Sequence, residues 1–548
     1  MHYTLPLDQF YHWEKTKPDR VYLSQPVEGK ARTWTWKEAG LEARKMAAYL
    51  LSLDLPPKSN IALISKNCAH WMICDIAIMM AGHTSVPLYP NLTPGSIRKI
   101  LEHSEAPLLF VGKLDNWTDM KPGVPDHVKC ISFPIYPHSG YDQWDQVITN
   151  QTPLSGEVRR DADELMTIIY TSGTTGMPKG VMHSFATVAF AISEGVKFIG
   201  LTEQERFFSY LPLAHVGERL VVGMGSLYAG GAVYFAESID TFSKNLQDAQ
   251  PTVFLGVHRI WKKFQEGILA KLPESRLHIL LRIPILNGII KRKIKHALGF
   301  SQVRVILTAA SPTPPELIHW FKRLDITLLE GYSMTENFGY SHANPPERIK
   351  IGTVGKPLPF SEVRLGEHNE VQVRNAANML GYYKEPELTR EMFTDDGYMR
   401  TGDEGLIDQD GYLTITGRTK DIFKTSKGKY VVPAPIELRL ASEAELEFCC
   451  VTGYALPQPI ALVTLSEGGK AMDQQELSRL LEAKWNAINK SLDAHEKLQK
   501  IVVIKDAWTP DNDLLTPTFK LKRNEIERRY KDMMDTWYQH HDPIVFAT

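Results

Sequence analysis

Short apolar runs alternate with helix-forming stretches along the first part of the chain, and this alternation constrains the fold more than any other feature of the sequence. In Thr35–Leu55 the apolar residues lie on one face of a helix, Thr35 and Glu38 can form a capping box, and two prolines follow. The next segments have the patterns of strand, helix, strand, helix and strand, in this order: Asn60–Ser65, Cys68–Gly82, Ser85–Tyr89, Thr93–His103 and Leu108–Val111. Strands separated by helices of this length pair in parallel through helical crossovers. We therefore expect an α/β fold with parallel-rich sheets and crossover helices.

The alternation continues along the chain and then changes its character. Further strands are predicted at Ala232–Phe235, Thr252–Leu255, Val303–Thr308 and Ile326–Leu329. From about Glu370 the strands are short and separated by turns, and beyond about Lys420 a smaller region mixes strands and helices: Phe448–Tyr454, Ala461–Leu465, Asp473–Asn489 and Ile501–Ile504. We place a domain boundary near Arg418–Asp421. The predicted organisation is a large N-terminal domain of several subdomains, residues 1–418, and a small α+β C-terminal domain, residues 419–548.

Composition excludes several classes of function. A chain of 548 residues, 43% of them apolar, is too long for one ordinary domain. The 62 basic and 64 acidic residues give a net charge of −2, without the basic excess of a nucleic-acid-binding protein, so no nucleic-acid partner is expected. The five cysteines have no C-x-x-C spacing, which argues against a zinc site and suits a reducing compartment. The sequence has no signal-peptide pattern and no run of about 18 apolar residues, so we expect a cytoplasmic protein.

A run of small residues after the predicted strand Leu165–Tyr170 has the composition of a phosphate-binding loop. It consists of Thr171, Ser172, Gly173, Thr174, Thr175 and Gly176. Glycines let backbone N–H groups approach phosphate oxygens, hydroxyl groups donate hydrogen bonds, and Lys179 adds a positive charge. Because Met177 and Pro178 come directly after Gly176, the run does not have the Walker A spacing. The alternative is a surface loop without a ligand.

At these residues the chain resembles the adenylate-forming superfamily, which includes acyl-CoA synthetases, luciferases and nonribosomal-peptide adenylation domains. Residues Thr171–Gly180 match the family signature Ser/Thr-Ser-Gly-Thr-Thr-Gly-x-Pro-Lys-Gly throughout. The resemblance implies that Thr171 to Gly176 and Lys179 bind the phosphates of ATP. Further motifs follow in the order of the family and cover nearly the whole chain.

Two segments resemble the family's adenine and metal motifs. Glu330–Glu336 is similar to Tyr-Gly-x-Thr-Glu, with Ser333 in place of the usual glycine. The resemblance implies that Tyr332 stacks on adenine, Thr335 contacts a phosphate and Glu336 binds Mg²⁺. The alternative is an ordinary strand-to-helix turn. Ala310, within Thr308–Pro312, would supply backbone near the adenine.

Three segments resemble motifs around the domain boundary and near the C-terminus. Asp403, in Thr-Gly-Asp, would accept the ribose hydroxyls, and Arg418 would also contact the ribose. Lys420 would be the hinge about which a mobile C-terminal domain rotates. Lys520, in Leu-Thr-Pro-Thr-Phe-Lys-Leu-Lys-Arg, aligns with the lysine that supports adenylate formation. The alternative for this last segment is a solvated basic stretch.

Other segments bring the chain closest to the long-chain fatty acyl-CoA synthetase branch. Leu211–Arg219 is similar to Leu-Pro-Leu-x-His-x-x-Glu-Arg, which implies that His215 lines the acyl pocket, although a lone histidine can also be purely structural. Thr252–Trp261 is similar to Thr-x-Phe-x-x-Val-Pro-Arg-x-Tyr/Trp, with His258 in place of the proline. After the hinge, Ser426–Tyr430 departs from the usual Gly-Gly-Glu or Gln-Gly-Glu, and Lys429 stands where a glutamate is common.

The resemblance implies an acid–thiol ligase that uses ATP, Mg²⁺ and coenzyme A. A fatty acid of medium to long chain would form an acyl-adenylate and pyrophosphate, and coenzyme A would then take the acyl group. The alternatives are an acyl-AMP ligase that loads a carrier-protein phosphopantetheine, a luciferase-like oxygenase, and a non-catalytic nucleotide-binding homologue. A basic cluster, Lys291–His296, fits a solvated helix face, which we favour, or peripheral contact with an anionic membrane.

Overall fold

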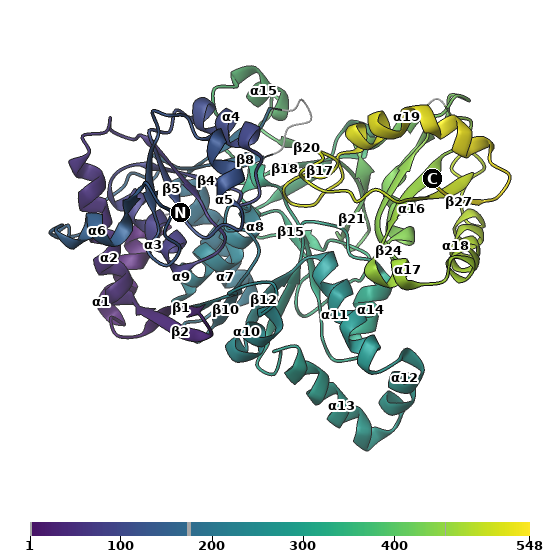
Figure 1. The fold of residues 1–548 in the computed structure, drawn as a ribbon, viewed down its shortest axis with the longest axis horizontal. Helices are drawn as coiled ribbons and strands as arrows, with labels where there is room; N and C mark the ends of the chain where they lie inside the picture. The colour runs from purple at the N-terminus through teal and green to yellow at the C-terminus, as the bar shows by residue number, and fades with distance from the viewer. Residues whose placement is uncertain (1–2, 172–176, 455, 548) are drawn as a thin grey trace.

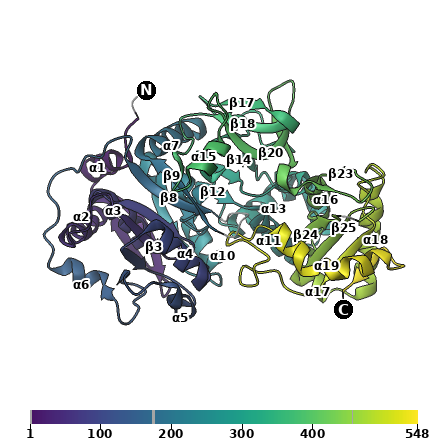
Figure 2. The same ribbon diagram turned by 90° about the horizontal axis from the view of Figure 1, so that it is seen from above.

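Two lobes make up the molecule. The computed structural model describes residues 3–171, 177–454 and 456–547. A large lobe holds the N-terminal part of the chain, and a smaller lobe, formed by the last part of the chain, lies beside it in both views (Figure 1 and Figure 2). The large lobe is built on two mixed sheets that are rich in parallel pairs. The predicted α/β class is confirmed.

One sheet of the large lobe carries the strand that leads into the predicted phosphate loop. Its strands, in spatial order, are β19 (Gly381–Tyr382), β9 (Lys179–Ser184), β8 (Leu165–Thr171), β4 (Thr84–Leu88), β3 (Asn60–Ile64), β5 (Leu108–Val111), β6 (Lys129–Ser132) and β7 (Asp142–Gln143). The pairs from β8 to β7 are parallel, whereas β9 is antiparallel to both β8 and β19. The predicted phosphate loop therefore connects two antiparallel strands.

The second sheet of the large lobe carries the adenine motif. Its strands, in spatial order, are β16 (Lys356–Pro357), β15 (His342–Ala343), β14 (Leu329–Tyr332), β13 (Val305–Thr308), β12 (Val253–Gly256), β10 (Arg206–Ser209), β11 (Ala232–Phe235), β1 (Val21–Val27) and β2 (Lys30–Thr35). The pairs from β14 to β1 are parallel. Because β12, β13 and β14 end at the same edge, the segments that follow them lie close together.

Helices cover these sheets and fill the space between them. They are α1 (Pro6–Thr16), α2 (Trp36–Ser52), α3 (Ala69–Met80), α4 (Pro94–Ser104), α5 (Trp117–Met120), α6 (Trp144–Thr149), α7 (Phe185–Ile199), α8 (Val216–Glu218), α9 (Gly225–Ala229), α10 (Phe242–Ala249), α11 (His258–Lys271), α12 (Glu274–Arg282), α13 (Pro284–Ala297), α14 (Pro315–Lys322) and α15 (Pro386–Met392). The predicted capping box of α2 is present, with Thr35 accepting from the Glu38 N–H. Every residue of α3 is buried, as expected for a helix that is apolar on all sides.

A buried ion pair ties α3 to the segment that carries the acyl motif. The Arg219 guanidinium donates to both carboxylate oxygens of Asp75 at 2.8 and 2.9 Å, and to the Thr167 hydroxyl at 2.9 Å. Arg219 begins a single π-helical stretch, Arg219–Met224. Both charges are at most 2% exposed, so removing one partner would leave the other buried and uncompensated.

The predicted strand Ile326–Leu329 is wrong by three residues. The structure has β14 at Leu329–Tyr332, because pairing with β13 begins at Leu329, opposite Leu307. Ile326 and Leu328 are buried against the side chains of α14 and neighbouring helices without entering the ladder. Tyr332 consequently lies at the end of the strand itself, not in the turn after it.

The last part of the chain contains three further sheets. A four-stranded antiparallel sheet is formed by β17 (Glu362–Leu365), β18 (Glu370–Arg374), β20 (Met399–Ile407) and β21 (Leu413–Arg418). The smaller lobe has a hairpin, β22 (Phe423–Lys424) and β23 (Tyr430–Val431), and a sheet of β24 (Leu446–Thr452), β25 (Ile460–Leu465), β26 (Lys500–Ile504) and β27 (Ile544–Phe546). Its helices are α16 (Pro433–Leu440), α17 (Glu467–Ala471), α18 (Gln474–Asn489) and α19 (Arg523–Gln539). The boundary between residues 418 and 419 stays a prediction.

Within the described ranges, each helix is too short or too polar to cross a membrane.

Candidate active site

Lys179 lies at the start of β9, opposite the last residue of β8. Thr171 and Lys179 form a register pair, and the predicted phosphate ligands Ser172, Gly173, Thr174, Thr175 and Gly176 lie outside the described residues. The Lys179 ammonium lies 5.2 Å from the centre of the Tyr382 ring, within the range of a cation–π contact. Partial burial lowers the pKa of Lys179, and repulsion from Lys420 lowers it further. The predicted phosphate lysine and the predicted hinge lysine are therefore neighbours.

Glu336 is held by β19, a strand that the sequence analysis did not single out. It lies in a one-turn 3₁₀ helix, Thr335–Asn337, shortly after β14. The Tyr382 hydroxyl donates to Glu336 Oε1 at 2.8 Å, and the Met379 N–H donates to the Glu336 carbonyl at 2.7 Å. No motif of the sequence analysis includes Tyr382, so this contact was not predicted.

The surroundings of Glu336 fit a metal that arrives with a phosphate ligand. Among the described residues, no group of three or more His, Cys, Asp or Glu side chains could hold a metal ion. Mg²⁺ commonly takes one or two carboxylates and completes its octahedron with phosphate oxygens and water. A single carboxylate beside Lys179 therefore suits magnesium carried by a nucleotide, not a metal bound by the protein alone.

Thr335 is fixed through its backbone. The His183 ring nitrogen Nε2 lies 2.7 Å from the Thr335 carbonyl oxygen, and burial lowers the pKa of His183 to about 4. A neutral imidazole that donates from Nε2 can satisfy this carbonyl. The contact joins β9 to the turn after β14, so the phosphate-loop strand and the Thr335–Glu336 turn are held in one arrangement.

Tyr332, Asp403 and Arg418 form a hydrogen-bonded group between two sheets. The Tyr332 hydroxyl donates to Asp403 Oδ2 at 2.7 Å, and Arg418 Nε donates to Asp403 Oδ1 at 3.1 Å. Asp403 is 8% exposed and Arg418 is 59% exposed, so the carboxylate is enclosed by protein while much of the arginine side chain is accessible. A carboxylate has about four lone-pair positions, so Asp403 can accept further bonds from a diol.

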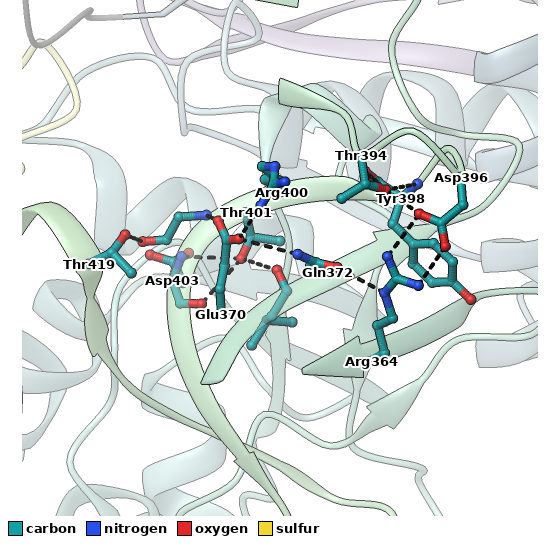
Figure 3. A network of polar contacts seen from close by, with 12 residues as sticks. Arg364, Glu370, Gln372, Thr394, Asp396, Tyr398, Arg400, Thr401, Asp403 and Thr419 are labelled. Carbon is teal, nitrogen blue, oxygen red and sulfur yellow. Dashed lines mark hydrogen bonds and ion pairs between the residues drawn. The ribbon is translucent and has the colours of Figure 1, made fainter. Parts of the chain in front are cut away.

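Backbone contacts hold Asp403 in place (Figure 3). The Thr401 hydroxyl donates to the Val371 carbonyl at 2.6 Å, and the Gly402 N–H donates to Glu370 Oε1 at 3.1 Å. The Thr419 hydroxyl donates to the Gly402 carbonyl at 2.7 Å. Gly402 has φ = +69°, a left-handed conformation that glycine adopts without strain. These bonds tie the predicted ribose site to the residue that precedes the predicted hinge.

Ala310 follows the end of β13 and has φ = +72°, which is uncommon for a residue with a Cβ. Because Thr308 pairs with Glu330, the segment after β13 lies beside the end of β14, where Tyr332 is found. Burial raises the pKa of Glu330 to about 7, although its Oε1 accepts from the Thr313 N–H at 3.3 Å. Strained backbone at the edge of a sheet often lines a binding site, and here it adjoins the predicted stacking tyrosine.

Lys520 lies on a tight loop of the smaller lobe that reaches the large lobe. Its N–H donates to the Thr516 hydroxyl at 3.0 Å, its carbonyl accepts from the Thr516 N–H at 2.8 Å, and Asn91 donates to the Pro517 carbonyl at 2.9 Å. The residue as a whole is exposed, although neighbouring protein atoms partly desolvate its ammonium. This desolvation, followed by repulsion from Arg418, lowers the pKa of Lys520 to about 8.

The same electrostatic interactions identify the neighbours of Lys520. Asp403 and Glu336 stabilise its charge, while Arg418 opposes it. His215 also responds to it: burial lowers the pKa of His215 to about 4, and Lys520 contributes in the same direction. The structure therefore brings the predicted adenylation lysine to the predicted ribose, metal and acyl residues.

His215 is fixed by the turn that it caps. Its Nδ1 accepts from the Gly217 N–H at 3.1 Å, which leaves the proton of the neutral ring on Nε2. The loop before it is anchored by Asn67, which donates to the Leu211 carbonyl at 2.6 Å and accepts from the Leu213 N–H at 3.1 Å. Asn67 is a further residue that the sequence motifs did not indicate.

Lys429 lies in a turn of the smaller lobe. Thr425 and Lys429 close this turn through a 2.9 Å N–H to carbonyl bond, and Gly428 within it has φ = +76°. Residues 426 to 430 are exposed. Lys429 therefore presents a positive charge on the surface where the resemblance leads us to expect a carboxylate.

Solved structures with a similar fold extend over nearly the whole chain. The anthranilate CoA ligase AuaEII in complex with anthranoyl-AMP superposes with a TM-score of 0.82 at 21% sequence identity, over 97% of this chain and 98% of that one. The A domain of carboxylic acid reductase from Segniliparus rugosus, in complex with AMP and a carboxylic acid, superposes with a TM-score of 0.79 at 21% identity, over 97% and 94% of the two chains. The likeness includes both lobes of the fold.

Similar sequences include three curated proteins that match end to end. Long-chain-fatty-acid–CoA ligase FadD15 of Mycobacterium bovis is 28% identical over 96% of each chain. Fatty acyl-CoA synthetase A of Dictyostelium discoideum is 28% identical over 95% of this chain and 88% of its own. Long chain acyl-CoA synthetase 2 of Arabidopsis thaliana is 28% identical over 97% of this chain and 93% of its own.

Two family models divide the chain between them. The AMP-binding enzyme model matches residues 10–383, and the model of the AMP-binding enzyme C-terminal domain matches residues 420–542. The first match alone spans more than half of the chain. The chain therefore belongs to the AMP-binding enzyme family, as its phosphate-loop signature predicted.

Proposed function

We propose that the protein is an AMP-forming fatty acyl-CoA synthetase. The observation that carries this proposal is that Lys179, Glu336, Asp403, Arg418 and Lys520 interact electrostatically with one another where the two lobes meet. Such a set of charges suits the binding of a nucleotide triphosphate and a carboxylate. The names of the three curated relatives support a fatty acid as the carboxylic substrate and coenzyme A as the acceptor.

In the first half-reaction the fatty acid carboxylate attacks the α-phosphate of ATP, and pyrophosphate leaves. Tyr332 stacks on the adenine and Asp403 accepts hydrogen bonds from the ribose hydroxyls, so that the adenosine is oriented. Lys179 and Lys520 neutralise charge on the phosphates. When bound, Mg²⁺ at Glu336 would neutralise further charge on the phosphate oxygens. Positioning and charge neutralisation supply most of the acceleration in such transfers.

In the second half-reaction the thiol of coenzyme A attacks the acyl carbonyl and AMP leaves. We propose that the smaller lobe turns about Lys420 between the steps, which would remove Lys520 and admit the thiol. The neutral, buried His215 suits contact with an acyl chain better than an imidazolium would, because a charge costs more to desolvate.

The experiment that tests the proposal measures AMP release with a series of fatty acids, with and without coenzyme A. We expect AMP and thioester in equal amounts, with activity rising toward medium or long chains. Adenylate that accumulates without thioester, and is discharged by a phosphopantetheine carrier protein, would identify the acyl-AMP ligase alternative and direct attention to Lys429. Absence of any fatty-acid-dependent adenylate would contradict the proposal.

The sequence alone favoured a solvated helix face for the basic cluster, but the exposed isoleucines beside it change this interpretation. We also propose that the helical pair α12–α13 contacts an anionic membrane surface, from which a fatty acid could be taken up. The pair projects from the large lobe at the bottom of Figure 1. Ile279, Ile283 and Ile285, at 59%, 42% and 79% exposure, gather around the corner between the two helices. Residues 274–297 carry six basic side chains against the single acid Glu274, and of these six Lys291 pairs with Asp325 at 2.9 Å. Exposed apolar residues beside unbalanced basic ones suit an interface with anionic lipids.

A further inference from the structure

Arg259 joins the large lobe to three groups of the smaller lobe at once. It is the second residue of α11, which follows β12 at the edge where the nucleotide residues gather. Its guanidinium donates to Glu447 Oε1 at 2.6 Å and lies 4.9 Å from the centre of the Phe448 ring and 5.0 Å from that of the Phe519 ring. A planar guanidinium can pair with a carboxylate in its plane and stack on rings above and below it.

One of these rings belongs to the residue next to Lys520. Phe519 has φ = +59°, and its N–H donates to the Thr516 carbonyl at 2.8 Å, so the loop turns sharply just before Lys520. Phe519 is 47% exposed and contributes little to the core of its own lobe. Its contact with Arg259 therefore serves to hold the loop against the large lobe.

Lys262, one turn further along α11, reinforces the contact. Its ammonium donates to the Glu443 carbonyl at 2.5 Å and to the Leu446 carbonyl. Burial lowers the pKa of both Lys262 and Arg259. At Arg259 the nearby Glu447 carboxylate partly offsets this lowering. These contacts join the two lobes in the arrangement that places Lys520 near Arg418, Asp403 and Glu336.

We infer that Arg259 is a positioning residue that holds Lys520 in place for adenylate formation. It acts through Phe519 and Glu447 and stabilises the arrangement of lobes that the first half-reaction needs. A rotation of the smaller lobe breaks the contacts, so Arg259 contributes nothing to the arrangement that forms the thioester. A residue that stabilises one of two arrangements changes the two half-reactions in different ways. The inference rests on the proposed function.

The test measures the rates of the two half-reactions separately in the variant Arg259→Ala. We expect the rate of fatty-acid-dependent ATP–pyrophosphate exchange to fall about fivefold to tenfold, because the variant loses both a cation–π contact and a partly exposed ion pair. Thioester formation from supplied acyl-adenylate and coenzyme A should stay within about twofold of the unsubstituted protein or rise. Lys263→Ala is the matched control, because Lys263 is exposed on the same helix and has no described hydrogen bond or ion pair.

A charge exchange keeps the inference testable if the single variant is poorly folded. Arg259→Glu should lose pyrophosphate exchange, and combining it with Glu447→Arg should restore part of the loss. Equal loss of both half-reactions in Arg259→Ala, or no recovery in a well-folded double variant, would overturn the inference. If the unsubstituted protein forms no acyl-adenylate from any fatty acid, the proposed function fails instead.

Discussion

His215 and Lys520, two neighbouring residues of the candidate site, differ in how readily they carry a positive charge. His215 is neutral because burial lowers its pKa to about 4, whereas Lys520 lies near the point at which it loses its proton, with a pKa of about 8. The cause is the same in both cases, since protein atoms replace water around a cation, and Arg418 adds repulsion at Lys520. A lysine is charged below its pKa, so Lys520 neutralises phosphate charge in neutral solution and ceases to do so as the pH rises.

This environment predicts an alkaline decline of adenylation. The ratio kcat/KM for ATP in pyrophosphate exchange should fall above about pH 8, by up to about tenfold per pH unit, because it reports groups of the free enzyme. In Lys520→Arg the side chain keeps its charge, so whatever activity remains should not show this fall. A profile that is flat to about pH 9.5, or the same decline in both proteins, would count against Lys520 as the titrating group.

At the scale of elements, strands and helices were easier to predict from the sequence than their contacts. The spans Leu108–Val111, Ala232–Phe235 and Glu370–Arg374 match strands of the structure, since apolar alternation and turn residues are local signals. The start of β14 was wrong because its partner strand, not its own apolar run, decides where pairing begins.

For the site residues too, local motifs were easier to predict than contacts between distant segments. Tyr332, Asp403, Arg418 and Lys520 stand in local motifs and could be named in advance, although their roles stay predictions. Their partners could not be named, because the contact of Arg259 with Glu447 joins residues 188 positions apart. Tyr382 was overlooked because a tyrosine in a short edge strand has no pattern of its own that indicates a bond to Glu336.

The helical pair α12–α13 carries a prediction of its own. The protein should bind vesicles that contain anionic phospholipid more tightly than vesicles of neutral phospholipid, and salt should weaken the binding. Replacing Ile283 and Ile285 together by serine should weaken binding about tenfold or more, because both lose their apolar contact with lipid. Ile239→Ser, which removes an isoleucine that is 85% exposed elsewhere, is the control. Equal binding by all three proteins, or no binding at all, would contradict membrane contact through this pair.

At the scale of the whole molecule, the two lobes meet in one defined arrangement. Asn91, Arg259 and Lys262 of the large lobe hold the loop and the sheet edge of the smaller one, and Lys520 is thereby brought to the nucleotide residues. In the proposed function, this arrangement serves the first half-reaction. The proposal assigns the second half-reaction to a different placement of the smaller lobe, with Lys420, which interacts with Lys179, as the proposed pivot.

The most direct test of this account is the behaviour of Lys520→Ala in the two half-reactions, measured separately. The account predicts that fatty-acid-dependent ATP–pyrophosphate exchange falls about a hundredfold or more, the usual effect of losing a group that stabilises transition-state charge. It also predicts that thioester formation from supplied acyl-adenylate and coenzyme A stays within about twofold of the unsubstituted protein, because the proposed rotation removes Lys520 from the reacting atoms in that step. An equal loss of both half-reactions, or unchanged pyrophosphate exchange, would contradict it.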